Sequence, residues 1–232
     1  MSQVTSITFF KYKGFKQKWK ALKNMGLLPK ELRKVEGSIF TKLLGSGGGT
    51  GFGVAPNFGV YGLLHVWESK EKAELFFKSD LYQTLKNESS EQWTTFFKCY
   101  KKIGAWDKQM PFIIDEERDM NAPIVVITRA SIKLWRTIPF WRRVPAISKF
   151  ILTKDANIFS VGVGEIPWIY QVTFSIWKSE EEMIQFAHKD KHHGEAAKIS
   201  LDKNWFKEYM FNRFYLVESR GTWEGKEMDD LI

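Results

Sequence analysis

An internal repeat limits the folds that this chain can adopt. The segment WESKEKAELFFKSD, which begins at Trp67, returns as WKSEEEMIQFAHKD at Trp177. Five positions are identical at a constant offset of 110, namely Trp67/Trp177, Ser69/Ser179, Glu71/Glu181, Phe76/Phe186 and Asp80/Asp190. Repeated units bury their apolar faces against one another. We therefore expect two similar halves, and a polar group present in only one of them is a candidate for function.

The two halves show the same order of predicted elements. In the first half we expect strands at residues 4–10, 60–67 and 93–100, and a basic helix at residues 15–25 that ends at Gly26 in a left-handed cap. Ser69 is positioned to cap a second helix. In the second half, strands are expected at residues 124–128 and 169–177, and Ser179 with Glu182 forms a capping box. A final strand is expected to close the half, from about residue 205.

Each half is interpreted as a strand, helix, strand, strand, helix, strand unit, which is the ferredoxin-like βαββαβ unit. Such a sheet has helices on one face only, so two of them can bury their bare faces together. The predicted fold class is α+β, a tandem duplication of the ferredoxin-like unit with two sheets packed as an intrachain α+β barrel. We expect an N-terminal half at residues 1–106, a linker at 107–122 and a C-terminal half at 123–232.

Composition and charge narrow the possible partners. The chain of 232 residues is 44% hydrophobic and 16% aromatic, and it carries a net charge of +8. Basic residues interleaved with Trp and Phe gather at residues 11–34 and 133–150. Nucleic acid, an anionic membrane surface, an acidic redox partner and a solvated basic face are all compatible with this pattern. The N-terminus lacks the features of a signal peptide, and no apolar run approaches the roughly 18 residues of a membrane span, so a cytoplasmic location is expected.

Histidines gather in the second copy of the repeat. The segment FAHKDKHHGEAAK holds His188, His192 and His193, where the first half has Lys78, Tyr82 and Gln83. Imidazole is a common ligand for haem iron and for zinc, but no Cys or His spacing completes a zinc site. Histidines on the surface of a helix remain the alternative.

The other candidate groups carry weaker signals. Strand alternation puts His65 on a buried face, between the two sheets, as a core histidine or, second, as a ligand. The single cysteine, Cys99, is expected to be a buried thiol. The loop GSGGGTGFG lacks both phosphate-binding spacings, so we expect a loop or a pocket lid. The segment Gly162-Val163-Gly164-Glu165 with Trp168 suits either the approach of a planar ligand or a tight bulge.

Several ordered motifs resemble one family over nearly the whole chain. They are NFGVYGLLHVW, WRRVPAIS, VGVGEIPWIYQVTFSIWKS, FAHKDKHHGEAAK and NWFKEYMFNRFYLVESRGTWEG. Together they are similar to the spheroidene monooxygenase family of carotenoid-modifying haem proteins. The resemblance implies a haem-dependent monooxygenase of the dimeric α+β barrel type, which introduces a keto group into a carotenoid or a similar long apolar substrate. It also implies molecular oxygen as oxidant and a ferredoxin-type electron donor.

The resemblance assigns the haem to the C-terminal half. His193 is then the candidate ligand to the iron, and His192 is the alternative. Arg142, Arg143, Trp168 and Gln171 are weaker candidates for the cofactor pocket. The basic and aromatic segments would give peripheral contact with the inner membrane surface.

Two other functions remain as alternatives. One is a non-enzymatic protein that binds haem or a hydrophobic small molecule. The other is nucleic-acid binding through the basic face, which the core periodicity of the aromatic residues does not favour. The oligomeric state is left open, because two fused units can satisfy each other within one chain.

Overall fold

A computed structural model describes residues 2–49, 52, 53, 55–142, 144, 155–189 and 203–229. The first half of the chain forms four strands and four helices. In chain order they are β1 (Val4–Lys11), α1 (Phe15–Leu27), α2 (Pro29–Leu32), β2 (Ser38–Gly47), β3 (Pro56–Trp67), α3 (Lys70–Phe77), α4 (Asp80–Glu88) and β4 (Glu91–Lys101).

The second half repeats this order, as far as it is described, with shorter helices and a long last strand, β8. They are β5 (Ile124–Ile132), the 3-10 helix η1 (Leu134–Arg136), α5 (Thr137–Trp141), β6 (Asn157–Gly164), β7 (Tyr170–Trp177), α7 (Glu180–Ile184), the π-helix η2 (Gln185–Lys189), β8 (Phe206–Trp223) and β9 (Lys226–Glu227).

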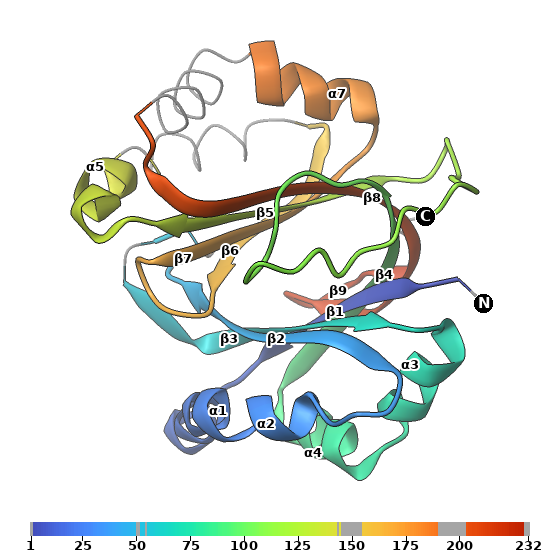
Figure 1. The fold of residues 1–232 in the computed structure, drawn as a ribbon. Coiled ribbons are helices and arrows are strands. Elements are labelled where there is room, and N and C mark those ends of the chain that lie inside the picture. The colour runs from blue at the N-terminus through green and yellow to red at the C-terminus, as the bar shows by residue number, and fades with distance from the viewer. Residues whose placement is uncertain are drawn as a thin grey trace.

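The strands form one antiparallel ring, as Figure 1 shows. Their order is β4-β1-β3-β2-β6-β7-β5-β8, and a further pairing between β4 and β8 closes the circle. The two junctions between the halves are unequal. Strands β4 and β8 pair from Trp93 to Lys101, whereas β2 and β6 share two residue pairs, Gly45 with Gly164 and Ser46 with Val163. The predicted α+β fold is confirmed, with the two sheets joined edge to edge into a ring.

Aromatic and aliphatic side chains from both halves fill the inside of the ring. Phe9 of β1 lies 5.4 Å from Phe174 of β7 between ring centroids, and Trp93 and Phe97 of β4 belong to the same cluster. These side chains are inaccessible to solvent. Burial of this apolar area is the main favourable contribution to folding. The halves therefore share a core, as the repeat predicts.

The helices cover the outer face of the ring. Helices α1 to α4 lie beneath the first half in Figure 1, and α7 lies above the second half. Leu32, Phe76 and Tyr82 pack on the outer face of the first sheet, while Met183 and Phe186 pack on the outer face of the second.

The two predicted helix caps are confirmed. Ser69 Oγ accepts a hydrogen bond from Lys72 N at 3.4 Å, and Ser179 Oγ accepts one from Glu182 N at 3.3 Å. Each serine satisfies an amide that would otherwise lack a partner in the first turn. The repeat therefore preserves the start of these helices.

Two sequence-based expectations were wrong. Gly26 does not end α1 in a left-handed cap, because the helix continues to Leu27 and the Leu28 amide bonds to Asn24 O. His65 does not lie between the sheets. It faces outward, with its ring 4.8 Å from that of Phe76 in α3. The interior positions of β3 are instead held by Leu64 and Val66.

None of the helices in the described ranges is both long and apolar enough to cross a lipid bilayer.

Candidate functional site

A cavity of about 190 Å³ lies at the weaker junction of the ring, where β2 meets β6. Backbone pairing stops after two residue pairs here, so the strand ends separate and side chains line the space between them. Four parts of the chain form the walls. They are α1 with Leu22 and Met25, the β2–β3 hairpin, α5 with Trp141, and the β6–β7 hairpin.

The β6–β7 hairpin wall needs glycine and a strained turn. A Cβ atom at Gly164 would lie 2.1 Å from Tyr170 O, which no side chain can accommodate. Trp168 adopts a φ of 66°, a left-handed conformation that is costly for a bulky residue. Its carbonyl accepts a hydrogen bond from Trp141 Nε1 at 3.0 Å, which ties the turn to α5. The tight-bulge interpretation therefore explains Gly164, and the same turn brings the large ring of Trp168 to the cavity.

Two hydroxyl groups in the cavity wall have no hydrogen-bond partner among the described residues. They are Ser46 Oγ of β2 and Tyr61 Oη of β3, and both atoms are buried. A buried polar group without a partner costs roughly 1–3 kcal/mol, so native proteins keep few of them. Burial also raises the pKa of Tyr61, so its phenol stays protonated and can donate a hydrogen bond. The wall thus offers two unused polar groups to a ligand.

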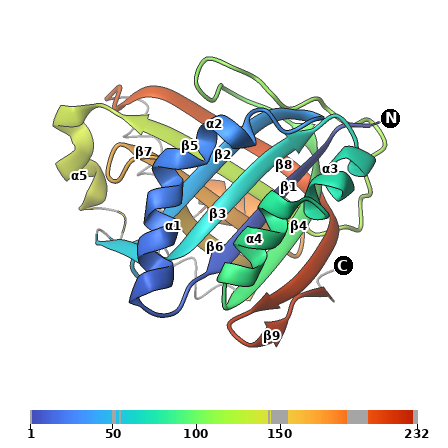
Figure 2. The ribbon, with the colours of Figure 1, turned by 90° about the horizontal axis from the view of Figure 1, so that it is seen from below.

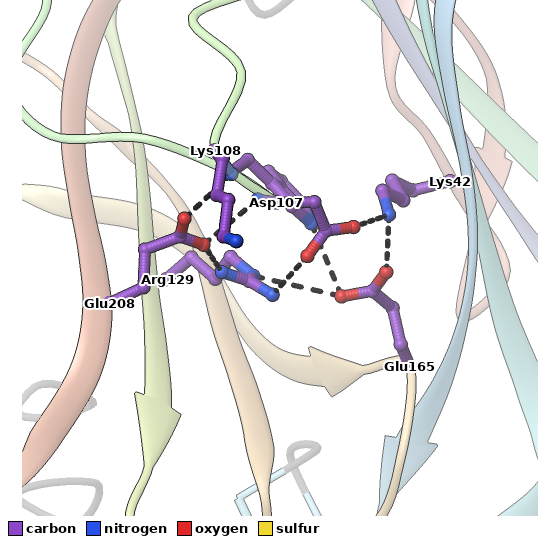
Figure 3. A network of polar contacts seen from close by, with 7 residues as sticks. Lys42, Asp107, Lys108, Arg129, Glu165 and Glu208 are labelled. Atoms are coloured by element: carbon purple, nitrogen blue, oxygen red, sulfur yellow. Dashed lines mark hydrogen bonds and ion pairs between the residues drawn. The ribbon is translucent and has the colours of Figure 1, made fainter.

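A charged network lies next to the cavity and includes its wall residue Glu165, as Figure 3 shows. Glu165 Oε1 lies 2.6 Å from Lys42 Nζ of β2, and Glu165 Oε2 accepts from Trp106 Nε1 at 3.2 Å. Arg129 of β5 pairs with Glu208 of β8 and, at 2.7 Å, with Asp107. The network therefore joins both halves and the segment between them.

Arg129 is the buried centre of this network. Its side chain is 1% exposed, and its guanidinium lies 5.1 Å from the Tyr170 ring and 5.6 Å from the Trp106 ring. Charged groups are buried at high cost unless they are paired. The pairs with Asp107 and Glu208 meet this requirement, and Glu165 adds a third carboxylate at 3.6 Å from Nε. The network thereby fixes the position of Glu165 in the cavity wall.

Part of this network is held in strained backbone. Asp107 and Lys108 have φ values of 53° and 61°. Their amides donate to the Glu208 carboxylate at 2.8 and 2.7 Å. These hydrogen bonds offset the cost of the left-handed conformation. The segment that follows β4 is therefore anchored to β8 at this point.

The structure brings together two of the site residues predicted from sequence. Trp168 and Gln171 both line the cavity, and the Gln171 amide donates to Val172 O at 3.3 Å. Arg142 is exposed at the C-terminal end of α5, directly after the wall residue Trp141, and is not itself part of the wall. Arg143, His192 and His193 lie outside the described residues, so their assignment stays a prediction.

The remaining candidate groups do not form a reactive centre. Cys99 is buried, as predicted, and burial raises the pKa of its thiol to about 11. His65 is also buried, which lowers the pKa of its imidazole to about 3, and its Nε2 has no partner among the described residues. Within the described ranges, no three His, Cys, Asp or Glu side chains are grouped so as to hold a metal ion.

Sequence reasoning missed Ser46, Tyr61 and the charged network. One signal for the network was present, since Arg129 is the only charge in the apolar strand IVVITRASI. A lone arginine in such a strand needs buried carboxylate partners. The partners themselves are separated by as many as 101 positions, as Asp107 is from Glu208, and carry no shared pattern.

Comparison with known proteins places the chain in a family. No family model matches it. A curated spheroidene monooxygenase from Cereibacter sphaeroides is 35% identical over 227 residues, which cover 97% of this chain and 70% of that protein. Another protein of that name, from Rhodobacter capsulatus, is 31% identical over 97% of this chain and 94% of its own length. The chain belongs to the spheroidene monooxygenase family. It is therefore a monooxygenase and an oxidoreductase, as the sequence motifs predict.

Solved structures of other activities share the fold of this family member. An aldoxime dehydratase crystallised with butyraldoxime has a TM-score of 0.62 at 9% identity, covering 92% of this chain and 79% of its own. A second aldoxime dehydratase has a TM-score of 0.60 at 10% identity, covering 92% and 81%. At these identities the likeness concerns the fold alone.

The described walls meet part of what a haem requires. The glycines of the β6–β7 hairpin and the Trp168 ring allow a flat ligand to lie close to the β2–β6 junction. The hydroxyls of Ser46 and Tyr61 can form hydrogen bonds with it. The volume of about 190 Å³ is below the roughly 300–1,000 Å³ usual for small-molecule sites, so a tetrapyrrole would extend beyond these walls. The described lining contains no histidine or cysteine to bind iron. A haem bound at this cavity would therefore take any histidine ligand from outside the described lining.

Proposed function

We propose that this monooxygenase introduces a keto group into a long apolar substrate of the carotenoid type, at the cavity between β2 and β6. The proposal depends on one observation above all. The cavity combines apolar and aromatic walls with two buried hydroxyls that have no partner among the described residues. Its relatives are named for spheroidene, which supports the substrate class.

The reaction balances as two successive hydroxylations of one carbon. Each hydroxylation places one atom of O2 in a C–H bond and releases the other as water, taking two electrons and two protons from an external donor. The resulting geminal diol loses water and leaves the ketone. A ferredoxin-type protein is our proposal for the donor, as the family resemblance implies.

In this proposal the wall residues bind and orient the substrate. Trp141 and Trp168 offer flat apolar surfaces to a conjugated chain, and Leu22 and Met25 exclude water from the same space. The Tyr61 phenol, which burial keeps protonated, donates a hydrogen bond to the oxygen introduced on the substrate. Ser46 Oγ, on the paired strand β2, is the second unpaired hydroxyl of the wall and a candidate partner for a polar group of the substrate.

We further propose haem as the cofactor that, when bound, supplies the activation of molecular oxygen. His193 would bind its iron, with His192 as the alternative. Arg142 and Arg143 would pair with its propionates by charge-assisted hydrogen bonds. Gln171 and Trp168 would lie against it from the β6–β7 hairpin, which is where they meet the cavity.

An absorption spectrum tests the cofactor. Protein produced with an adequate haem supply is expected to show a Soret band, and His193→Ala is expected to lose or shift it. His192→Ala is the matched control and should leave the spectrum unchanged. If neither substitution alters the band, both histidines are excluded as ligands, and a preparation with no band contradicts the haem proposal.

Product analysis tests the reaction itself. With a carotenoid in detergent micelles, we expect ketone formation that requires both O2 and a reductant, with one oxygen atom of the product derived from labelled O2. Retention of the carotenoid without oxidation, under conditions that give a reduced cofactor, would favour the alternative of a binding protein.

A further inference from the structure

The cavity at the β2–β6 junction, here called the seam cavity, is bordered by two surface helices that expose apolar side chains. Leu22 of α1 and Trp141 of α5 are both part of its wall. Both helices lie toward the same end of the molecule in the two perpendicular views of Figure 1 and Figure 2. The surface around the cavity is therefore formed by α1 on one side and α5 on the other.

Helix α1 carries an apolar stripe on its outward face. Phe15, Trp19 and Leu22 are 85%, 52% and 37% exposed, and their spacing of four and three residues places them on one side of the helix. The buried face is marked instead by Ala21. An amphipathic helix normally turns its apolar side inward, so this outward stripe is not explained by the fold.

The segment around α5 has the same character. Leu134, Trp135 and Ile138 are 60%, 70% and 67% exposed. The β6–β7 hairpin adds Ile166 and Trp168, which are 47% and 49% exposed at the cavity itself. Exposed tryptophan and aliphatic residues thus surround the cavity from both halves of the chain.

The two sequence segments that carry these helices are basic. The sequence contains no Asp or Glu from residue 1 to 30, where it has seven lysines, and none from residue 133 to 154, where it has six lysines and arginines. All 27 acidic residues lie elsewhere. Lys16 and Lys23 are exposed on α1 and form no ion pair with the described residues. The face therefore complements a negatively charged surface.

We propose that α1 and the η1–α5 segment dock onto an anionic lipid bilayer, and that the seam cavity opens toward this bilayer. Basic residues beside exposed Trp, Phe and Leu side chains are the features of helices that lie in a membrane interface. An acidic protein would meet the charges, but it would leave the outward apolar stripes unexplained. Leu22 belongs to both the stripe and the cavity wall, so an apolar substrate can pass from lipid to cavity without entering water. This route relies on the proposed function, whereas the docking does not.

Vesicle sedimentation tests the docking without substrate. The full chain is expected to bind vesicles of phosphatidylcholine mixed with phosphatidylglycerol, more weakly as salt is raised, and to bind pure phosphatidylcholine less. The double variant Lys16→Glu/Lys23→Glu should lower binding to the anionic vesicles at least about tenfold. Lys78→Glu/Lys86→Glu, two exposed lysines of the α3–α4 region, gives the same change in net charge and should have a much smaller effect.

A second pair of variants tests the apolar contacts. Trp19→Ser/Trp135→Ser should weaken binding, while Leu75→Ser/Met110→Ser, at residues 61% and 67% exposed away from this face, should not. All these side chains are exposed, so thermal unfolding should be unchanged. Equal losses in test and control variants would overturn the proposal. So would variants that weaken binding of an acidic iron–sulfur protein but leave vesicle binding intact.

Activity separates this proposal from the proposed function. The Lys16→Glu/Lys23→Glu and Trp19→Ser/Trp135→Ser variants should retain oxidation of a carotenoid presented in detergent micelles, and lose it at least about tenfold when the carotenoid is embedded in anionic vesicles. Vesicle binding by a protein that oxidises no carotenoid in either form would support docking and contradict the function. Full activity on vesicle-embedded substrate in the variants would contradict docking alone.

Discussion

Lys42 of β2 and Glu165 beside β6 form an ion pair across the junction where the two halves share two backbone pairs, with Nζ and Oε1 2.6 Å apart. Glu165 is at the same time a wall of the cavity. One contact therefore joins the halves and positions the candidate site. Because Arg129 holds the rest of this network together, the stability of the junction and the shape of the site are coupled.

Replacing Arg129 should destabilise the fold strongly. In Arg129→Met, Asp107 and Glu165 would keep only their pairs with Lys42, and Glu208 would lose its ion pair, all in partly buried positions. We expect a loss of about 3–5 kcal/mol in the free energy of unfolding, measured by urea denaturation. Lys20→Met removes an exposed pair with Glu88 and should cost less than about 1 kcal/mol. Similar losses in both variants would show that the network does not stabilise the junction.

Tyr61→Phe should separate function from stability. Because Tyr61 Oη has no partner among the described residues, its removal should leave the melting temperature unchanged or raise it, while product formation falls. Tyr82→Phe is the matched control, because Tyr82 Oη donates to Gln92 at 2.8 Å. That variant should lose about 0.5–1.5 kcal/mol of stability with turnover per folded molecule retained. Unchanged turnover in Tyr61→Phe would contradict a role for this hydroxyl.

His65 should make the protein sensitive to mild acid. Its pKa is lowered from 6.5 to about 3 by burial, so between these values the unfolded chain binds a proton that the folded chain does not. Stability that is complete above pH 6.5 is then lost as the pH falls, by about 1.4 kcal/mol per pH unit from this group. His65→Leu should remove this slope between pH 6.5 and 5, where the carboxylates have not yet titrated. Parallel stability curves for the two proteins would contradict burial of His65.

Glycine substitutions should have opposite effects at two positions. Gly164→Ala places a Cβ 2.1 Å from Tyr170 O and should cost about 1–3 kcal/mol while distorting the cavity wall. Gly26→Ala adds a methyl group in open space within α1 and should stabilise the protein by about 0.5–1 kcal/mol. Thermal unfolding of both variants measures the difference. A stable, fully active Gly164→Ala would rule out the tight hairpin.

The repeat and the strand periodicity predicted the architecture well because they reflect local chemistry. Ser69 and Ser179 cap helices for reasons contained in a few neighbouring residues. Alternation in β3 also predicted correctly that His65 is buried. It could not say which face the helices cover, because both faces of β3 are buried and both contain large apolar residues.

The site was less predictable because its parts meet only after the ring closes. Gln171 came from family resemblance, and Trp168 from that resemblance and from its place after a glycine-rich strand; the structure places both at the cavity. Ser46 and Tyr61 look like ordinary strand residues, and only the missing hydrogen bonds set them apart. Strand β2 was likewise not located from the sequence. Its end contains glycines, and the pairing of this end with β6 depends on the other half of the chain.

The inequality of the two junctions has a consequence for how such a protein can diversify. Strands β4 and β8 pair from Trp93 to Lys101 with two register shifts, so an insertion there would displace many backbone pairs. At the opposite junction two backbone pairs join β2 to β6, so side chains such as Lys42 and Glu165 largely determine the fit, and substitutions there can reshape the cavity without breaking a strand ladder.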